Sequence, residues 1–482
     1  MTARNVLVDS FRTIEANRLA WYWPVAVALV IAPLSAWFLF IGRYEYAAVA
    51  AIAAPLAVLV LRDPFKGLLL WVVLIPFVVT REAVTVSTTQ WVLHRAGIVV
   101  LIGLVYAYHV AGLRRSLFRL AWYDVALAAF VVVAIFNVLA FGSEGTRGLA
   151  SLHDKLLVPI ALFWLVRAIS PDRKQMALLV LAGLFVLVVQ IGVGAMSWFA
   201  PEILPSHWLD RAGSRTTGTL GGPAPFTVTV VLFGLLVLHR LWEMRPSLEK
   251  FVLAGTLVAS GLVVFLSLSR GSWLGAGAVI LMLGAVYRRT FLWPAVVVVV
   301  VVLALLGGPL ADQAELAEER AGVTSTVESR TITNVAAVRM IEERPVFGFG
   351  FGRFEDYDER YKSRVGDIPL ETGGSAHNTY LNFAAEMGLP ATALYFAPLV
   401  GLLWLSVTRR HLLPDTGPYS RRLVLFLWLA LLDQFLVCNF MEMVQSSAWA
   451  TGLWWLTLGL IAVAIDRQRQ LAVALPGRSA EI

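Results

Sequence analysis

Long apolar stretches alternate with short polar connectors along most of this chain. Uninterrupted apolar runs of about 16–24 residues, unlike alternating segments of about ten, are typical of membrane-spanning helices. Because the lipid interior offers no hydrogen-bond partners, each run must satisfy its backbone polar groups within a helix. We therefore expect an all-α polytopic membrane protein with about 14 transmembrane helices. The predicted spans are 24–42, 46–61, 66–80, 96–113, 122–141, 155–169, 176–199, 223–239, 251–267, 272–287, 291–308, 389–407, 423–440 and 448–465.

One long polar interval, residues 309–388, interrupts this pattern. Within it, residues 331–343 and 378–387 carry apolar side chains at helical spacing, and a Gly-Leu-Pro sequence ends the second of these helices. A glycine-punctuated turn at 344–352 lies between them. We expect the interval to fold as a cap of short helices on the membrane surface.

The composition and the charge pattern fit this arrangement. The chain is 59% hydrophobic and only 15% charged, whereas soluble proteins are typically about 25% charged. Lys and Arg gather in every second connector, which predicts cytoplasmic termini and an extracytoplasmic 309–388 loop. The net charge of +7 then marks cytoplasmic loops and is no indication of nucleic-acid binding. A single cysteine, Cys438, excludes an internal disulfide and a cysteine-based metal cluster.

The polar loop contains one histidine at the start of a predicted helix, His377. Thr372 or Ser375 is a plausible cap for this helix. The positive end of the helix favours an anion, and its field favours a neutral imidazole that can accept a proton. The alternative is a histidine that only caps or hydrogen-bonds at the membrane interface.

Two arginines on the same predicted face are candidates for an anionic ligand. Arg270 lies where two spans meet, in a connector too short to carry its guanidinium into bulk water. Gly271 and Gly275 follow it as a GxxxG face that permits close helix approach. Arg215 lies in a glycine-rich outer loop. Arginine matches phosphate oxygens through its planar fork, so the two suggest a diphosphate site. A buried ion pair or snorkelling to lipid headgroups is the alternative for Arg270.

Other polar groups admit more than one interpretation. Asp433, Asn439 and Glu442 lie near the outer end of the penultimate span, where substrate contact and pairing with an arginine are both open. The glycines of the 344–352 turn lack the strand–turn–helix context of a nucleotide-binding loop. No set of residues has metal-ligand spacing, so we expect neither a metal nor another cofactor.

Three motifs in the second half of the chain resemble the O-antigen ligase/polymerase superfamily. They are Ser269-Arg270-Gly271, then Arg330 leading to Glu343-Arg344-Pro345-Val346-Phe347-Gly348-Phe349-Gly350, then His377-Asn378-Thr379-Tyr380-Leu381 with Glu386-Met387-Gly388-Leu389-Pro390. Their order matches the family, as does the position of the loop between two late spans. The resemblance covers roughly residues 211–401. It implies three regions: an N-terminal transmembrane bundle (1–210), a catalytic region that includes the loop (211–407), and C-terminal helices with a cytoplasmic tail (408–482).

The resemblance also implies an activity and a site. Members of the family are metal-independent, inverting glycosyltransferases of the GT-C type in the bacterial inner membrane. The donor implied is a glycan on undecaprenyl diphosphate at the periplasmic face, and the acceptor is lipid A–core or another glycan. The family's phosphate-contacting arginines correspond to Arg270 and Arg215, and its essential loop histidine corresponds to His377. Arg330 matches a recurrent family arginine.

Further residues of these motifs are candidates for substrate contact. They are Asn378 and Tyr380, in the helix start that carries His377, and Glu442, near the end of the penultimate span. One departure concerns Arg215. The family usually shows Gly-Asn-Pro-Asn after this arginine, whereas this chain has Gly221-Gly222-Pro223-Ala224, without either asparagine.

The resemblance leaves the acceptor open. A ligase passes finished polymer to lipid A–core, whereas a polymerase extends the lipid-linked chain, and both use the same donor; we expect a ligase. A flippase or transporter is an alternative from a different class. That alternative predicts internal repeats and charged or broken helices at mid-membrane, but the polar groups of this chain collect at the outer face.

Overall fold

The computed structural model describes residues 54–78, 91–112, 118–142, 145–210, 215–293, 325–362 and 376–474, with a few isolated positions elsewhere. All regular secondary structure in these residues is helical. The principal helices are α3 (Pro64–Val78), α5 (Gly97–Val110), α6 (Trp122–Phe141), α7 (Gly145–Leu152), α8 (Val158–Ile169), α9 (Arg173–Phe199), α10 (Pro223–Glu243), α11 (Leu248–Phe265), α12 (Arg270–Val286), α14 (Ser325–Glu343), α15 (Phe354–Tyr357), α16 (Thr379–Met387), α17 (Leu389–Thr408), α18 (Arg421–Val437), α19 (Met443–Ser446) and α20 (Ala448–Ala474).

Seven of the described helices are long and apolar enough to cross a membrane. They are Trp122–Phe141, Arg147–Ile169, Arg173–Phe199, Pro223–Glu243, Leu248–Phe265, Leu389–Thr408 and Ala448–Gln468, and three shorter apolar helices are Pro64–Val78, His94–Val110 and Arg270–Val286. The predicted helical class is therefore confirmed for the described residues. The predicted spans 24–42, 46–61 and 291–308 fall largely outside them.

Local sequence signals explain several helix boundaries. Asp172 caps α9 by accepting a hydrogen bond from the backbone N–H of Gln175, whose side chain bonds back to the backbone of Asp172. Pro223 starts α10, where its fixed φ suits the first helical turn.

The predicted span 423–440 is the helix α18, but it is not among the candidate spans. It has 17 residues and carries two arginines and an aspartate.

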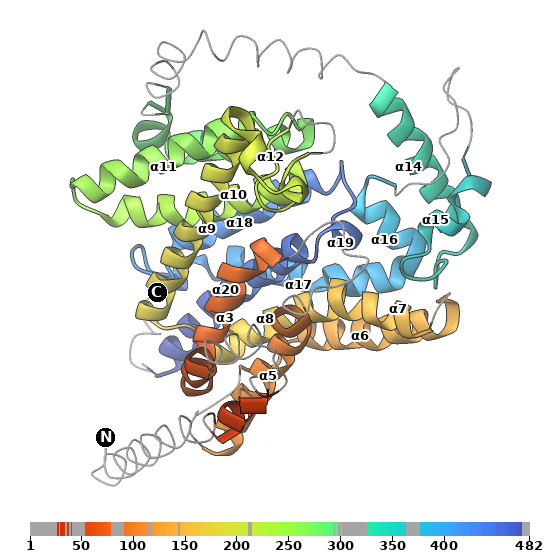
Figure 1. Ribbon diagram of the computed structural model, residues 1–482, viewed down its shortest axis with the longest axis horizontal. Helices are drawn as coiled ribbons and strands as arrows, with labels where there is room; N and C mark the ends of the chain where they lie inside the picture. The colour runs from red at the N-terminus through yellow and green to blue at the C-terminus, as the bar shows by residue number, and fades with distance from the viewer. Residues whose placement is uncertain are drawn as a thin grey trace.

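The last long helix, α20, lies at the centre of the bundle (Figure 1). Of its apolar window, 94% is buried within the protein, against 33% for α6 and α17. It packs against α8, α17, α18 and α10, while α18 packs in turn against α10 and α12. A helix that is apolar all round and buried in this way forms the core around which the others pack.

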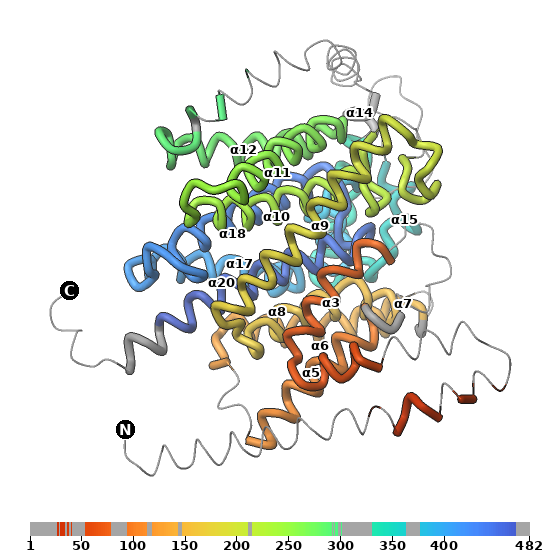
Figure 2. The backbone as a smooth tube through the Cα atoms, turned by 60° about the vertical axis from the view of Figure 1, so that its left-hand side comes forward, coloured from red at the N-terminus to blue at the C-terminus, as the bar shows by residue number. Residues whose placement is uncertain are grey.

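The short helices gather at one end of this bundle. In Figures 1 and 2, α14 and α15 lie beyond the ends of the long helices, on the side where α7 also lies. Helix α14 packs against α16, and α16 packs against α17. The predicted helices at 331–343 and 378–387 are confirmed as α14 and α16. Residues 309–324 and 363–375 of the loop lie outside the described residues.

Candidate functional site

His377 precedes α16 in an uncommon backbone conformation. Its side chain is exposed, and its φ of 50° lies in the left-handed region. For a residue other than glycine this costs roughly 1–2 kcal/mol. Asn378 caps the helix, because its side chain accepts hydrogen bonds from the N–H groups of Tyr380 and Leu381 at 3.0 and 3.1 Å. The prediction of Thr372 or Ser375 as the cap is therefore wrong: the helix begins later, directly after Asn378.

The backbone before His377 is fixed by two neighbours. The N–H of Ala376 donates to the side-chain oxygen of Asn382, 3.3 Å away. The hydroxyl of Thr333, on α14, lies 3.0 Å from the carbonyl oxygen of Arg330 and 3.4 Å from that of Ala376. The strained residue is thus held in place by surrounding contacts, as is common at functional sites. The same contacts bring Arg330 close to His377.

The backbone after His377 is bound to the segment that follows α18. The N–H of Thr379 donates to the carbonyl of Cys438 at 2.8 Å, and its hydroxyl donates to the carbonyl of Met441 at 2.7 Å. The same hydroxyl oxygen accepts the N–H of Met443 at 2.8 Å. Residues 438–443 therefore form a platform under the start of α16.

Arg215, Arg270 and Arg330 form a group that we call the arginine cluster. Burial is the largest cause that lowers the pKa of Arg330, and the charges of Arg270 and Arg215 lower it further. The Nε of Arg330 is buried and makes no hydrogen bond within the part of the chain that the structure describes. Three cations near one another repel, so an anion bound between them would be stabilised.

Two contacts explain why Arg215 and Arg270 meet. The N–H of Thr216 donates to the carbonyl of Leu266, 3.3 Å away, which fastens the loop of Arg215 to the end of α11. Leu268, with a φ of 46°, then turns the chain so that Arg270 begins α12. The structure thus brings together all three arginines that the sequence singled out, although Arg215 and Arg330 are 115 residues apart in the chain.

Helix α12 is held close to α18 by its two glycines. A Cβ at Gly271 would lie 3.0 Å from the Cβ of Phe440, and a Cβ at Gly275 would overlap the carboxylate of Asp433. The close approach predicted from the GxxxG pattern is confirmed. Phe440 belongs to the platform that also supports Thr379, so Arg270 and His377 border the same segment. The carboxylate of Asp433 makes no hydrogen bond among the described residues, and pairing with an arginine is not observed there.

The glycine turn at 344–352 docks onto the end of α16. The N–H groups of Phe349 and Gly350 donate to the carbonyls of Ala385 and Glu386 at 3.0 and 2.9 Å. Gly348 has a φ of 64°, and a Cβ there would overlap the carbonyl group of Glu386. Only glycine fits this close approach. The turn therefore positions α16.

Two buried acidic residues lie beside this turn: Glu442, a predicted substrate contact, and Glu386, which belongs to a family motif but has no role predicted from the sequence. Glu386 accepts from the N–H of Phe354 at 3.2 Å and from the side chain of Gln445 at 3.0 Å. Burial raises its pKa. Glu442 caps α19 by accepting from the N–H of Gln445. Burial, followed by the charge of Glu386, raises the pKa of Glu442 to about 8. An acidic residue inside an otherwise apolar helix was the available sequence signal for Glu386.

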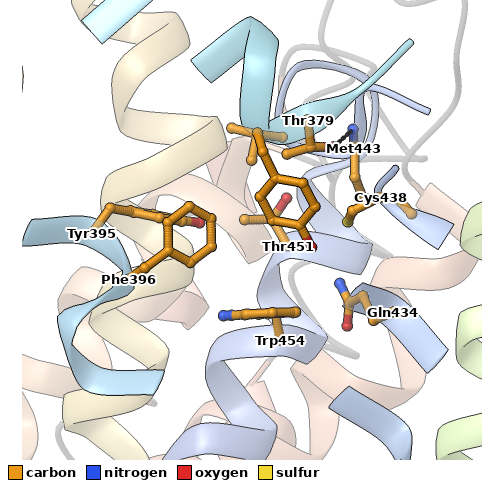
Figure 3. A pocket seen from close by; sticks show the side chains of 10 residues that line it. Thr379, Tyr395, Phe396, Gln434, Cys438, Met443, Thr451 and Trp454 are labelled. Atoms are coloured by element: carbon orange, nitrogen blue, oxygen red, sulfur yellow. Dashed lines mark hydrogen bonds between the residues drawn. The ribbon is translucent and has the colours of Figure 1, made fainter. Parts of the chain in front are cut away.

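Tyr380 and Asn378 have structural contacts of their own. The Tyr380 hydroxyl donates to the carbonyl of Phe435 at 3.0 Å, and its ring packs on Phe435 and Phe396. Beneath it lies a pocket of only about 20 Å³, large enough for a water molecule, whose walls include Tyr395, Phe396, Gln434, Cys438 and Trp454 (Figure 3). These contacts attach α16 to α18, and substrate contact by Asn378, Tyr380 or Glu442 stays a prediction.

Comparison with known proteins adds an independent result. Residues 255–396 match the family model described as O-antigen ligase, and no curated protein matches the chain. The matched region includes Arg270, Arg330 and His377, whereas Arg215 and Glu442 lie outside it. The match supports the resemblance carried by the motifs: residues 255–396 of this chain are similar to the O-antigen ligase family.

Proposed function

We propose that this multi-pass membrane protein transfers a glycan from undecaprenyl diphosphate to a sugar hydroxyl of lipid A–core at the periplasmic face. The observation that carries the proposal is the adjacency of the arginine cluster and His377 at one end of the helical bundle. This adjacency falls largely within the region that matches the O-antigen ligase family. The two groups supply a binding site for a diphosphate and a base for a hydroxyl.

In this proposal the arginine cluster binds the diphosphate. The guanidinium groups of Arg270 and Arg215 donate to phosphate oxygens, and Arg330 adds a third positive charge beside them. As the bond between C1 of the sugar and the diphosphate oxygen breaks, negative charge grows on the leaving group. The cluster stabilises that charge, which lowers the barrier more than it stabilises the bound donor.

His377 acts on the acceptor. The acceptor hydroxyl oxygen attacks C1 from the side opposite the diphosphate, its proton passes to the imidazole, and undecaprenyl diphosphate leaves with the bonding electron pair. The product is inverted at C1. A positioned base of this kind contributes typically about 10²–10⁴-fold to the rate. The left-handed backbone at His377, fixed on both sides, supports a side chain whose direction matters.

The proposed orientation places both termini in the cytoplasm and residues 309–388 in the periplasm. We assign Arg215, Arg270, Arg330 and His377 to a catalytic region at 211–407, with 1–210 and 408–482 supplying the rest of the transmembrane bundle. The distribution of Lys and Arg along the connectors supports this orientation. Labelling of single cysteines at exposed loop positions by a membrane-impermeant reagent tests it, and a cytoplasmic 309–388 loop would refute the proposal.

Purified full-length protein in lipid nanodiscs provides the direct test of the chemistry. With a lipid-linked glycan donor and lipid A–core, we expect His377→Ala to reduce transfer at least about 100-fold. We expect Arg270→Lys to reduce it about 10–100-fold, because an ammonium does not reproduce the bidentate contact. His411→Ala and Arg173→Lys are matched controls, since both residues are exposed: Arg173 begins α9, whose other end leads to Arg215, and His411 follows the far end of α17, whose start follows α16. Near-normal turnover of His377→Ala would disprove the base role.

Deletion of the gene in its host separates the three activities. Lipid-linked polymer that is not attached to lipid A–core is the expected result for a ligase. Lipid A–core that carries single repeats would instead indicate a polymerase, and accumulation of lipid-linked units on the cytoplasmic side would indicate a flippase.

A further inference from the structure

A polar cavity of about 340 Å³ lies beside α16, outside the arginine cluster. Its volume is within the range of about 300–1,000 Å³ that is usual for small-molecule sites. Five segments form its walls: the turn of helix before α8, the end of the glycine turn, the start of α15, α16, and the segment that includes α19. The lining residues are Lys155, Gly352, Phe354, Glu355, Asn382, Glu386, Glu442, Gln445 and Ser446.

A hydrogen-bond network holds the charged groups of the cavity. Lys155 donates to the side-chain oxygen of Gln445 at 2.8 Å, and the amide nitrogen of Gln445 donates to Glu386 at 3.0 Å. The backbone N–H of Gln445 donates to Glu442. An ammonium group has three donors and each carboxylate has several acceptor sites. The network therefore fixes the groups and leaves donors and acceptors on the cavity wall.

The charge of the cavity is opposite in sign to that of the arginine cluster. Three carboxyl groups, from Glu355, Glu386 and Glu442, face one ammonium, from Lys155, and Glu442 adds its negative charge above its pKa of about 8. A hydroxyl both donates and accepts hydrogen bonds, so a polyhydroxylated ring suits such a wall. A carboxylate or a phosphate on that ring would be repelled by the surplus of negative charge.

One side chain connects the cavity to His377. The side chain of Asn382 lines the cavity, and its amide oxygen accepts a hydrogen bond from the N–H of Ala376, the residue before His377. Asn382 lies on the second turn of α16, and Glu386 lies one turn further along the same helix. A ligand in the cavity would therefore lie along α16, below the histidine.

We propose that this cavity binds the terminal sugar of the acceptor and selects neutral or amino sugars over acidic ones. The inference rests on the proposed function, because it divides the two substrates of that reaction between two sites of opposite charge. The arginine cluster takes the diphosphate of the donor, and the cavity takes the hydroxyl-rich end of the acceptor. It applies to a ligase and to a polymerase alike.

Saturation-transfer difference NMR on the full-length protein in nanodiscs tests the cavity without any transfer reaction. The probes are methyl β-glucoside, glucosamine and glucuronate at pH 9, above the pKa of Glu442, so that this carboxyl group is ionised. We expect millimolar binding of the first two sugars and at least tenfold weaker binding of glucuronate. Glu442→Gln preserves the shape of the side chain and an oxygen that can cap α19, and we expect it to reduce the discrimination at least threefold. Glu355→Gln, at an exposed position, should act in the same direction.

Matched controls make each outcome decisive. Glu249→Gln changes an exposed glutamate at the start of α11, far along the chain from the cavity, and should leave all three affinities unchanged. Equal binding of the three sugars, or discrimination that is unaffected by both cavity variants, would overturn the inference. Binding of undecaprenyl diphosphate to the same preparation is measured in parallel. Retained donor binding without sugar binding rejects the cavity alone, whereas sugar binding without donor binding rejects the proposed function.

Discussion

Replacement of Asn137 tests how the candidate site is fastened to the bundle. This asparagine is fully buried on α6, more than 200 residues before the loop that it holds. Its amide nitrogen donates to the carbonyls of Phe347 and Glu386 at 2.7 and 3.4 Å, and its oxygen accepts the N–H of Phe351 at 2.9 Å. One side chain therefore joins α6, the glycine turn and the end of α16.

The cost of Asn137→Ala follows from the groups that it would leave unpaired. The N–H of Phe351 is buried, and an unsatisfied group of this kind costs about 1–3 kcal/mol. The carbonyl of Phe347 is only partly buried, so water replaces its partner at a cost of about 0.5–1.5 kcal/mol. The third bond, at 3.4 Å, is long and adds little. We expect a loss of about 1.5–4.5 kcal/mol in the stability of the docked turn.

Amide hydrogen exchange, measured by mass spectrometry on the protein in nanodiscs, reports this loss of stability of the docked turn. Because about 1.4 kcal/mol corresponds to a tenfold change in an equilibrium constant, exchange of the amides of Phe349 and Phe351 should accelerate about 10–2,000-fold. Asn137→Asp should be at least as disruptive, since it directs an oxygen at two carbonyl groups. Gln175→Ala removes an exposed capping bond on α9 and should leave the turn protected. Unchanged protection in Asn137→Ala would refute the reasoning.

Three further predictions concern the same end of the molecule. Gly348→Ala should undock the turn, because its backbone is left-handed and a Cβ would overlap Glu386; faster proteolysis of the loop at residues 353–362 reports it, and Gly255→Ala, which has open space, is the control. The folded protein binds a proton on Glu442 up to about pH 8, whereas the free carboxyl releases it near pH 4.5. Wild-type stability should therefore fall as pH rises from about 4.5 to 8 and then level off, and Glu442→Gln should flatten that slope in thermal unfolding. Gly275→Val should force α12 away from α18, displace Arg270 and weaken undecaprenyl diphosphate binding at least tenfold in a direct binding assay.

Hydrophobic patterning alone determined the helical class and most helix positions. The predicted span 122–141 coincides with α6, and the predicted helices in the loop appear as α14 and α16. These features depend on residues close together in the chain, which is why a single sequence contains them. The motifs around Arg270, Arg330 and His377 could be recognised in the sequence for the same reason, because each motif is a short continuous segment.

The surroundings of the site were decided by tertiary structure. The cap of α16 and the partners of Glu386 depend on residues that approach one another only after folding. Gln445 joins Lys155 and Glu386 across separations of 290 and 59 residues, and Asn137 reaches the glycine turn across 210. No local pattern specifies such contacts, because each arises from the packing of whole helices. The sequence by itself therefore determined which helices form and which residues are chemically suited to the site. Only the packing of those helices decided that the arginines gather near the start of α16 and that Glu386 and Glu442 face one cavity beside it.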